Sequence, residues 1–232
     1  MNIRANYDDW KNICDIIADK LEVDNDTRID NVIYEISKRV PDNSIVTTDV
    51  GQNQVWVAQK YNVSRNTQII FSGGHVAMGY SLPASIGASL KKSNPVISFL
   101  GDGGFQMNIQ ELEFIAREKL PILIVVINNN SLGMIRHFQE IYFSDNNPQT
   151  VIGQGYSVPD FVSVANAYKI KGYKIFSVDD LNEDMFLFKE PLLLEIFSNE
   201  KTYVKPRLKF GTSNQDQEPL IDRKLYEYLM GI

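Results

Sequence analysis

Residues 96–130 read VISFLGDGGFQMNIQELEFIAREKLPILIVVINNN, and the order of patterns in this stretch decides the fold. Two apolar runs, at 96–100 and 122–127, have the length of buried strands, and residues 108–118 between them have helical spacing. A strand, a helix and a second strand in this order predict two parallel strands joined by a crossover helix. Near-continuous apolar strands are typical of the centre of a parallel sheet, which is buried on both faces.

The same alternation continues on both sides of this stretch. Further strands are expected at 44–48, 68–71, 173–178 and 191–197, and further helices at 7–20, 28–39, 53–60, 80–90, 131–140, 159–168 and 222–230. An irregular stretch is expected at 142–158. Strands that alternate with helices predict an α/β protein of three layers, α/β/α, in which helices cover both faces of a mainly parallel central sheet.

Length, charge and cysteine content narrow the class of protein. The 232 residues suffice for one large α/β domain, and the net charge of −6 argues against a nucleic-acid or anionic-membrane partner. The N-terminal residues do not resemble a signal peptide, and no apolar run of about 18 residues predicts a membrane span. The single cysteine, Cys14, excludes an intrachain disulfide. We expect its thiol to be semi-buried and the protein to be cytoplasmic.

Four expected strands end in polar or glycine-rich turns. These turns lie at 49–53, 72–75, 101–104 and 128–131. In open α/β sheets, ligands bind beyond the carboxyl ends of the strands. The sequence therefore predicts one ligand site to which all four turns contribute.

Two of these turns carry side chains suited to a metal ion. Asp102 offers a carboxylate oxygen and Asn129 an amide oxygen, and Mg²⁺ prefers such oxygen ligands. Gly103 and Gly104 lack a Cβ, so their backbone N–H groups can approach a phosphate before a helix that we expect to begin near Asn108. Asp and Asn also cap helices routinely. Three consecutive asparagines after an apolar strand, together with Asp102, favour a metal and phosphate site over capping alone.

Other phosphate-binding motifs match less well. Residues 101–106 lack the third glycine of the dinucleotide fingerprint, and the P-loop lysine is absent. Phosphatases of the haloacid dehalogenase type also carry Gly-Asp-Gly, but they need an Asp-X-Asp nucleophile. Asp49-Val50-Gly51 does not supply one.

The spacing of the two turns resembles a known cofactor motif. Gly101-Asp102-Gly103, followed after 24 residues by Asn128-Asn129, is similar to the thiamine-diphosphate-binding motif. The segments at 46–56, 72–84 and 133–139 are similar to the corresponding segments of acetolactate synthase large subunits (acetohydroxyacid synthases). The resemblance covers about residues 30–200 and implies the thiamine-diphosphate-binding fold.

The resemblance also implies roles for individual residues. Three would ligate Mg²⁺, the first two through side chains and the third through its backbone carbonyl: Asp102, Asn129 and Ser131. Eight would contact thiamine diphosphate: Val50, Gly51, Gln52 and Asn53 on one side of the diphosphate, Gly103 and Gly104 on the other, Val76 at the aminopyrimidine and Met78 beneath the bent cofactor. No catalytic side chain is expected in this chain, because the activating glutamate of the family lies on a pyrimidine-binding domain.

The implied activity is that of a 2-keto acid decarboxylating carboligase, with some departures from acetolactate synthase. Asn53 stands where the family commonly has His, and Phe138 stands where a Trp commonly shapes the acceptor pocket. Residues 205–210 and 218–223 resemble thiamine-dependent homologues of surface-polysaccharide biosynthesis, some of which act on keto-sugars. A keto-sugar enzyme and a non-catalytic cofactor-binding module therefore remain as alternatives.

The resemblance also suggests how the chain is organised. We expect a helical linker from a preceding domain at 1–26, the diphosphate- and Mg-binding domain at 27–200, and a tail with a short helix at 201–232. Full-length relatives carry a pyrimidine-binding domain and a middle domain that often binds FAD, and they form homo-oligomers. The chain alone is therefore expected to be inactive.

Overall fold

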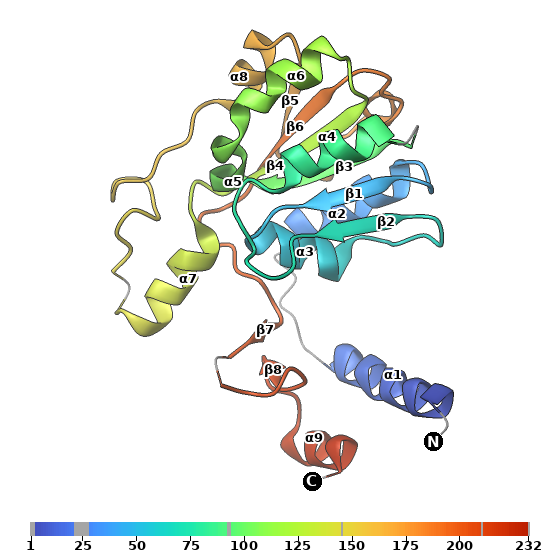
Figure 1. Cartoon of the computed structure of the whole chain (residues 1–232). Coiled ribbons are helices and arrows are strands. Elements are labelled where there is room, and N and C mark those ends of the chain that lie inside the picture. The colour runs from blue at the N-terminus through green and yellow to red at the C-terminus, as the bar shows by residue number, and fades with distance from the viewer. Residues whose placement is uncertain (1–2, 21–27, 92–93, 145, 210, 232) are drawn as a thin grey trace. The chain divides into compact units, whose positions relative to one another are not determined.

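The computed structural model describes residues 3–20, 28–91, 94–144, 146–209 and 211–231 (Figure 1). The chain divides into two compact units, of which the larger is Arg28–Tyr203. The smaller unit combines Met1–Thr27 with Val204–Ile232.

The larger unit is built around a six-stranded sheet in which every neighbouring pair is parallel. Its strands, in chain order, are β1 Ile45–Thr48, β2 Gln68–Phe71, β3 Val96–Gly101, β4 Ile122–Asn128, β5 Lys171–Ile175 and β6 Leu192–Phe197. Their order across the sheet is β2-β1-β3-β4-β6-β5. The predicted parallel α/β architecture is therefore confirmed.

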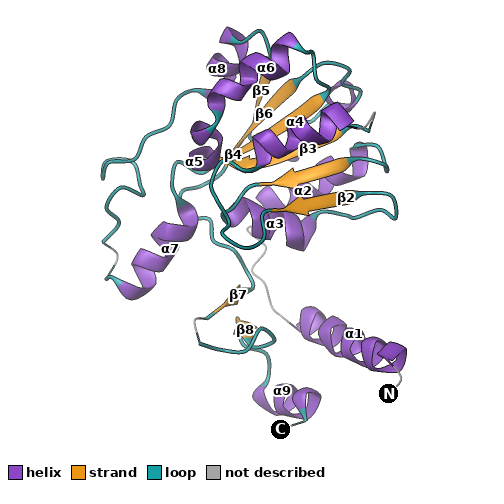
Figure 2. Ribbon diagram, in the orientation of Figure 1, coloured by secondary structure: helices purple, strands orange, loops and turns teal. Residues whose placement is uncertain are grey.

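Helices cover both faces of this sheet (Figure 2). The helices of the larger unit are α2 Arg28–Arg39, α3 Gln52–Lys60, α4 Ser81–Lys91, α5 Asp102–Met107, α6 Leu112–Arg117, α7 Gly133–Tyr142 and α8 Phe161–Ala167, with short 3₁₀ helices at Ile109–Glu111, Val178–Asp180 and Glu183–Phe186. One buried cluster joins α4, α5, α6 and α8 to one face of the strands. Helices α2 and α3 lie on the other face.

Strand β4 lies at the centre of the core, as its composition predicts. All of its residues are buried, and its apolar side chains face both layers of helices. Its register with β3 pairs Gly101 with Ile127. The two chain segments that leave these strands, at Asp102 and at Asn129, therefore start side by side at one edge of the sheet.

Some element boundaries differ from the predictions. The helix expected to begin near Asn108 begins at Asp102, as α5, and a 3₁₀ turn separates it from α6. The helix expected from Pro159 begins at Phe161, because the side chain of Asp160 accepts the Ser163 N–H and caps it. Strand β5 begins earlier than predicted, at Lys171, and ends at Ile175, so residues 176–178 of the predicted strand lie outside it and Val178 begins a 3₁₀ helix.

The smaller unit contains helix α1 (Ile3–Lys20), a two-stranded antiparallel hairpin and helix α9 (Arg223–Met230). The hairpin strands are β7 Arg207–Leu208 and β8 Gln217–Glu218. Ile17, Ile221 and Tyr226 form its small core. The Cys14 thiol on α1 is exposed, so the expectation of a semi-buried cysteine is wrong. Across the described residues, no helix has both the length and the apolar character that crossing a membrane requires.

Candidate functional site

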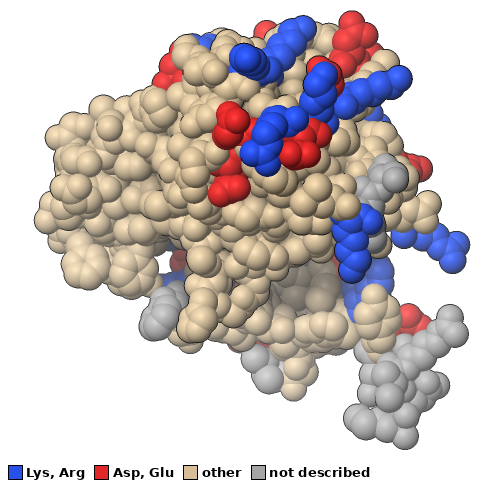
Figure 3. Space-filling model, turned by 45° about the horizontal axis from the view of Figure 1, so that its top comes forward, with Lys and Arg blue, Asp and Glu red and all other residues tan. Residues whose placement is uncertain are grey.

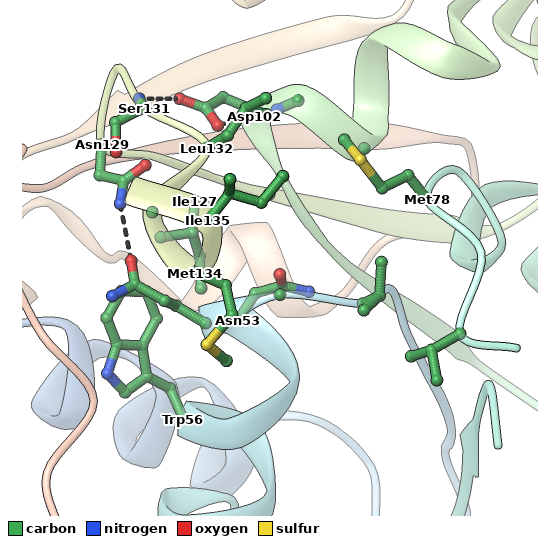
Figure 4. Close-up of a pocket in the computed structure, with 18 residues that line it drawn as sticks. Asn53, Trp56, Met78, Asp102, Ile127, Asn129, Ser131, Leu132, Met134 and Ile135 are labelled. Carbon is green, nitrogen blue, oxygen red and sulfur yellow. Dashed lines mark hydrogen bonds between the residues drawn. The ribbon is translucent and has the colours of Figure 1, made fainter. Parts of the chain in front are cut away.

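A cavity of about 280 Å³ opens at the carboxyl ends of β1, β3 and β4 (Figure 4). Its walls come from the turn after β1, the loop between β2 and α4, the start of α5, and the turn between β4 and α7. Of the predicted turns, only 72–75 contributes no lining residue, although Val76 and Met78 from the same loop do. Parallel strands thus bring segments that are distant in sequence to a single site.

The cavity brings together almost all of the predicted site residues. All of the predicted metal ligands and all of the predicted cofactor contacts line it: Asp102, Asn129 and Ser131, and Val50, Gly51, Gln52, Asn53, Val76, Met78, Gly103 and Gly104. Phe138 does not line it. This side chain lies on α7 and is 48% exposed, so the structure leaves it outside the pocket.

Asp102 is the central charged group of the cavity. It is the first residue of α5 and only 2% exposed, and its Oδ1 accepts the Gly103 N–H at 2.7 Å. Its Oδ2 accepts the Ser131 N–H at 3.1 Å, which ties the start of α5 to the turn after β4. Burial raises the pKa of Asp102 to about 6, while the hydrogen bond from Gly103 opposes the rise. A cation bound beside this carboxylate would stabilise its charged form.

Asn129 presents its amide oxygen beside Asp102 (Figure 4). Its Nδ2 donates to Gln52 Oε1 at 2.9 Å, and this bond determines which end of the amide faces the carboxylate. Gln52 is itself held, because its Nε2 donates to the Thr202 carbonyl at 3.0 Å. The glycine at 133 makes room for this pair, since a Cβ there would lie 2.0 Å from Gln52 Oε1.

Asn128 has a structural role that differs from that of Asn129. Its Nδ2 donates to Glu195 Oε1 on β6 at 2.8 Å, and its Oδ1 accepts the Asn130 N–H at 3.0 Å. Asn130 then adopts a left-handed conformation with φ 55°, which asparagine tolerates better than most residues. The consecutive asparagines therefore form a tight turn that directs Asn129 into the cavity.

Asp49 anchors the loop that carries Val76 and Met78. Its two carboxylate oxygens accept the Gly79 N–H at 2.9 Å and the Tyr80 N–H at 3.0 Å. Val76 has φ 52°, a costly conformation for a β-branched residue that such anchoring helps to maintain. From the sequence, Asp49 is considered as part of a phosphatase nucleophile motif, which it does not complete, and no anchoring role is predicted for it. Its anchoring role depends on contacts across 30 residues, which no local pattern reveals.

The sequence assigns no individual role in metal or cofactor binding to several of the lining residues. They are mostly apolar and belong to the same turns and helices as the predicted ones: Trp56, Gly101, Ile127, Leu132, Gly133, Met134 and Ile135. The motif at 133–139 predicts Phe138 as the residue that lines the acceptor pocket. Met134 and Ile135 lie one helical turn before Phe138 on the same side of α7. This earlier turn of the helix is the one that reaches the cavity.

The donor atoms of the cavity determine which kind of cation it suits. In the described part of the chain, no group of three or more His, Cys, Asp or Glu side chains is arranged to bind a metal. The cavity instead offers one carboxylate, one amide oxygen and backbone groups. Such a donor set suits a hard cation that shares its remaining positions with phosphate oxygens and water.

Comparison with known proteins agrees with this chemistry. Residues 49–196 match the family model of the thiamine pyrophosphate enzyme, C-terminal TPP binding domain. The acetolactate synthase large subunit of Lactococcus lactis is 35% identical over 222 residues, which cover 92% of this chain and 38% of that protein.

Two further relatives have related names. The acetolactate synthase isozyme 2 large subunit of Escherichia coli is 34% identical over 91% of this chain and 40% of its own length. The probable acetolactate synthase large subunit of Methanocaldococcus jannaschii is 39% identical over 71% of this chain and 28% of its own length. The match spans two fifths or less of each of these relatives.

Proposed function

Because this chain belongs to the thiamine pyrophosphate enzymes, as their C-terminal TPP binding domain, we propose that its cavity holds Mg²⁺ and the diphosphate of thiamine diphosphate. One observation carries the proposal: the Asp102 carboxylate, the Asn129 amide oxygen and the Ser131 residue lie together at one end of the cavity. Oxygen donors of this kind suit Mg²⁺, which usually completes its octahedron with phosphate oxygens and water.

The rest of the cavity fits a diphosphate bound to that ion. Gly103 and Gly104 bring backbone without Cβ atoms to one wall, and the turn at 50–53 forms another. When bound, thiamine diphosphate supplies the carbon nucleophile and the electron sink needed to decarboxylate a 2-keto acid and pass the remaining fragment to a second carbonyl. In this proposal, the chain's own residues hold the diphosphate and the metal and exclude water from them.

Val76 and Met78 line the cavity from the loop between β2 and α4. Figure 4 shows Met78 on the side of the cavity opposite Asn129. We propose that the Val76 backbone contacts the aminopyrimidine and that the Met78 side chain supports the bent cofactor. The hydrogen bonds from Gly79 and Tyr80 to Asp49 favour this role, because they keep the loop in place before the cofactor arrives.

The reaction class follows from the relatives rather than from the cavity. The similar proteins are named acetolactate synthases, which supports a 2-keto acid as donor substrate and a carboligase as the whole enzyme. Phe138 lies one helical turn beyond Met134, and we propose that it contacts the acceptor when the exposed side of α7 is covered. A keto-sugar acceptor remains the alternative suggested by the tail motifs.

Further groups are needed for catalysis. Among the described residues that line the cavity, Asp102 is the only carboxylic acid, and it is assigned to the metal. We therefore propose that the activating glutamate comes from a pyrimidine-binding domain, within a cytoplasmic homo-oligomer, and that a flavin, if any, binds elsewhere. The surface over α7 supports such docking, because it carries few charged side chains (Figure 3).

Cofactor binding tests the proposed function directly. Thiamine diphosphate is titrated into the chain with and without Mg²⁺, and binding is followed by tryptophan fluorescence, since Trp56 lines the cavity. Saturable binding that requires Mg²⁺ is expected, and Asp102→Ala should weaken it at least about tenfold because a charged ligand is lost. The isolated chain is expected to bind without turning over pyruvate.

The matched control is Asp179→Ala, which removes an exposed carboxylate on the 3₁₀ helix Val178–Asp180. Its affinity for the cofactor should equal that of the unmodified chain. Metal-independent binding, or unchanged binding by Asp102→Ala, would mean that the assignment of the metal site is wrong.

A further inference from the structure

Tyr156 lies in an irregular segment that is fastened to both turns carrying the proposed metal ligands. The Leu132 N–H donates to the Thr150 carbonyl at 2.9 Å, and Ser131 forms an antiparallel bridge with Val151. On the other side, Gln106 Nε2 of α5 donates to the Ser157 carbonyl at 3.4 Å. The segment therefore crosses from the Ser131 turn to the start of α5 and carries Tyr156 with it.

The hydroxyl group of Tyr156 is buried against the first turn of α5. A Cβ placed on Gly103 would lie 3.3 Å from this oxygen. Among the described residues, the hydroxyl has no hydrogen-bond partner of good geometry. A buried hydroxyl without a partner is unfavourable, so its persistence beside a predicted ligand site calls for an acceptor.

The Asp102 carboxylate is the acceptor at hand. The Tyr156 hydroxyl lies 3.3 Å from the Cβ position of Gly103, the residue that follows Asp102, so hydroxyl and carboxylate meet at the same first turn of α5. A phenol hydroxyl can donate a hydrogen bond, and a carboxylate oxygen can accept it. Asp102 already accepts from Gly103 and Ser131, and a carboxylate has room for a third donor.

We infer that Tyr156 is a positioning residue for Asp102, whose carboxylate its hydroxyl orients toward the metal. This inference rests on the proposed function, because it assigns Asp102 to Mg²⁺. Neutral donors that orient a metal-ligating carboxylate commonly affect metal affinity by about 10- to 100-fold. The sequence offered no signal for Tyr156, which stands in a stretch without regular periodicity.

The experiment measures the Mg²⁺ requirement of cofactor binding. With thiamine diphosphate held constant, Mg²⁺ is titrated into the unmodified chain and into Tyr156→Phe, which removes only the hydroxyl. The variant should need about tenfold more Mg²⁺ for half-maximal binding. Incorporation of 4-aminophenylalanine at position 156 restores a donor on the same ring and should recover most of the loss. Thermal melting of the cofactor-free chains checks that each variant is folded.

Tyr173→Phe is the control, since Tyr173 is also partly buried but lies on β5 at the edge of the sheet. Its Mg²⁺ requirement should not change. An unchanged requirement in Tyr156→Phe, or a loss that 4-aminophenylalanine does not recover, overturns the positioning role while leaving the proposed function intact. If the unmodified chain shows no Mg²⁺-dependent binding, the proposed function itself fails.

Discussion

At the scale of single residues, the cavity depends on positions where a side chain is either indispensable or excluded. Two separate hydrogen bonds hold side chains around the expected metal position: Asn129 donates to Gln52, and the Ser131 N–H donates to Asp102. Gly104 shows the opposite requirement, because a Cβ there would lie 1.8 Å from Asp49 Oδ2. This oxygen cannot move away freely, since it accepts the Gly79 N–H.

Gly104→Ala is therefore expected to be destabilising. The added methyl group must displace either α5 or the Asp49 carboxylate, and overpacking of this kind costs about 1–3 kcal/mol. Urea unfolding of the cofactor-free chain measures the change. Gly87→Ala is the control, because Gly87 is an exposed residue of α4 with nothing within 4 Å of its added Cβ. That change should stabilise the chain by roughly 0.5–1 kcal/mol through helix propensity. Equal effects of the two substitutions would contradict the packing described for Gly104.

Most of the individual site residues were predictable from the sequence, because they lie in short turns that directly follow strands. The glycines and polar residues after β1, β3 and β4 stand out against the apolar strands that precede them, and the parallel topology brings them together. Tyr156 and Asp49 were not predictable in their roles. Each acts through contacts with segments that are distant in sequence, so only the folded chain defines them.

At the scale of elements, the strands were more predictable than the helix starts. Strand β4 is buried along its whole length and was recognisable from composition alone. The sequence predicts that the helix after β3 begins near Asn108, four residues after Gly104. It begins at Asp102 instead, where tertiary contacts with Asp49, Met78 and Leu132 leave no space for larger residues.

A pH-dependent stability is expected from the contact between β6 and the turn after β4. Burial raises the pKa of Glu195 above its ordinary 4.5, and the hydrogen bond from Asn128 opposes the rise only in part. Between the unfolded and folded pKa values, the folded chain binds the proton more strongly. The free energy of unfolding therefore falls as the pH rises through this window.

In the Glu195→Gln variant the side chain cannot ionise, so the variant does not show this fall in the free energy of unfolding. We therefore compare the free energies of unfolding of the variant and the unmodified chain. The value for the variant minus that for the unmodified chain should increase as the pH rises from 4.5, the ordinary pKa of a glutamate, through the raised pKa of Glu195 in the folded chain. Denaturant unfolding at a series of pH values measures the difference, and groups common to both chains cancel. Glu113→Gln on the exposed side of α6 is the control and should give a constant difference. A constant difference for Glu195→Gln as well would show that burial does not perturb this carboxyl group.

At the scale of the whole molecule, helix α7 of the larger unit carries an exposed apolar surface. It is the outer face of α7, defined by Met134, Ile135, Phe138, Ile141 and Tyr142, all of which are more than two fifths exposed. Two of these residues also line the cavity, so the surface continues from its mouth. Contiguous apolar surface of this kind typically marks an interaction site.

The α7 face is expected to make the isolated chain self-associate. Ile141→Lys places a charge within the face and should weaken self-association by about tenfold, or roughly 1.4 kcal/mol. Sedimentation velocity over a range of concentrations measures this change. Leu187→Lys is the control, because Leu187 is more exposed than Ile141 and lies outside α7. If both substitutions act alike, association does not depend on the α7 face.

The order of strands explains why the cavity lies where it does. Strands β1 and β3 are neighbours in the sheet. From β1 the chain passes through α3 to β2, which lies on the far side of β1 from β3, whereas from β3 it passes through α5 and α6 to β4, which lies on the far side of β3 from β1. Right-handed crossovers in opposite directions carry the chain to opposite faces of the sheet. The segments after β1 and β3 therefore diverge and leave a crevice between them, as at the switch points of other open α/β sheets. The opening is thus a product of chain connectivity, so substitutions in its walls can change what binds without removing the place of binding.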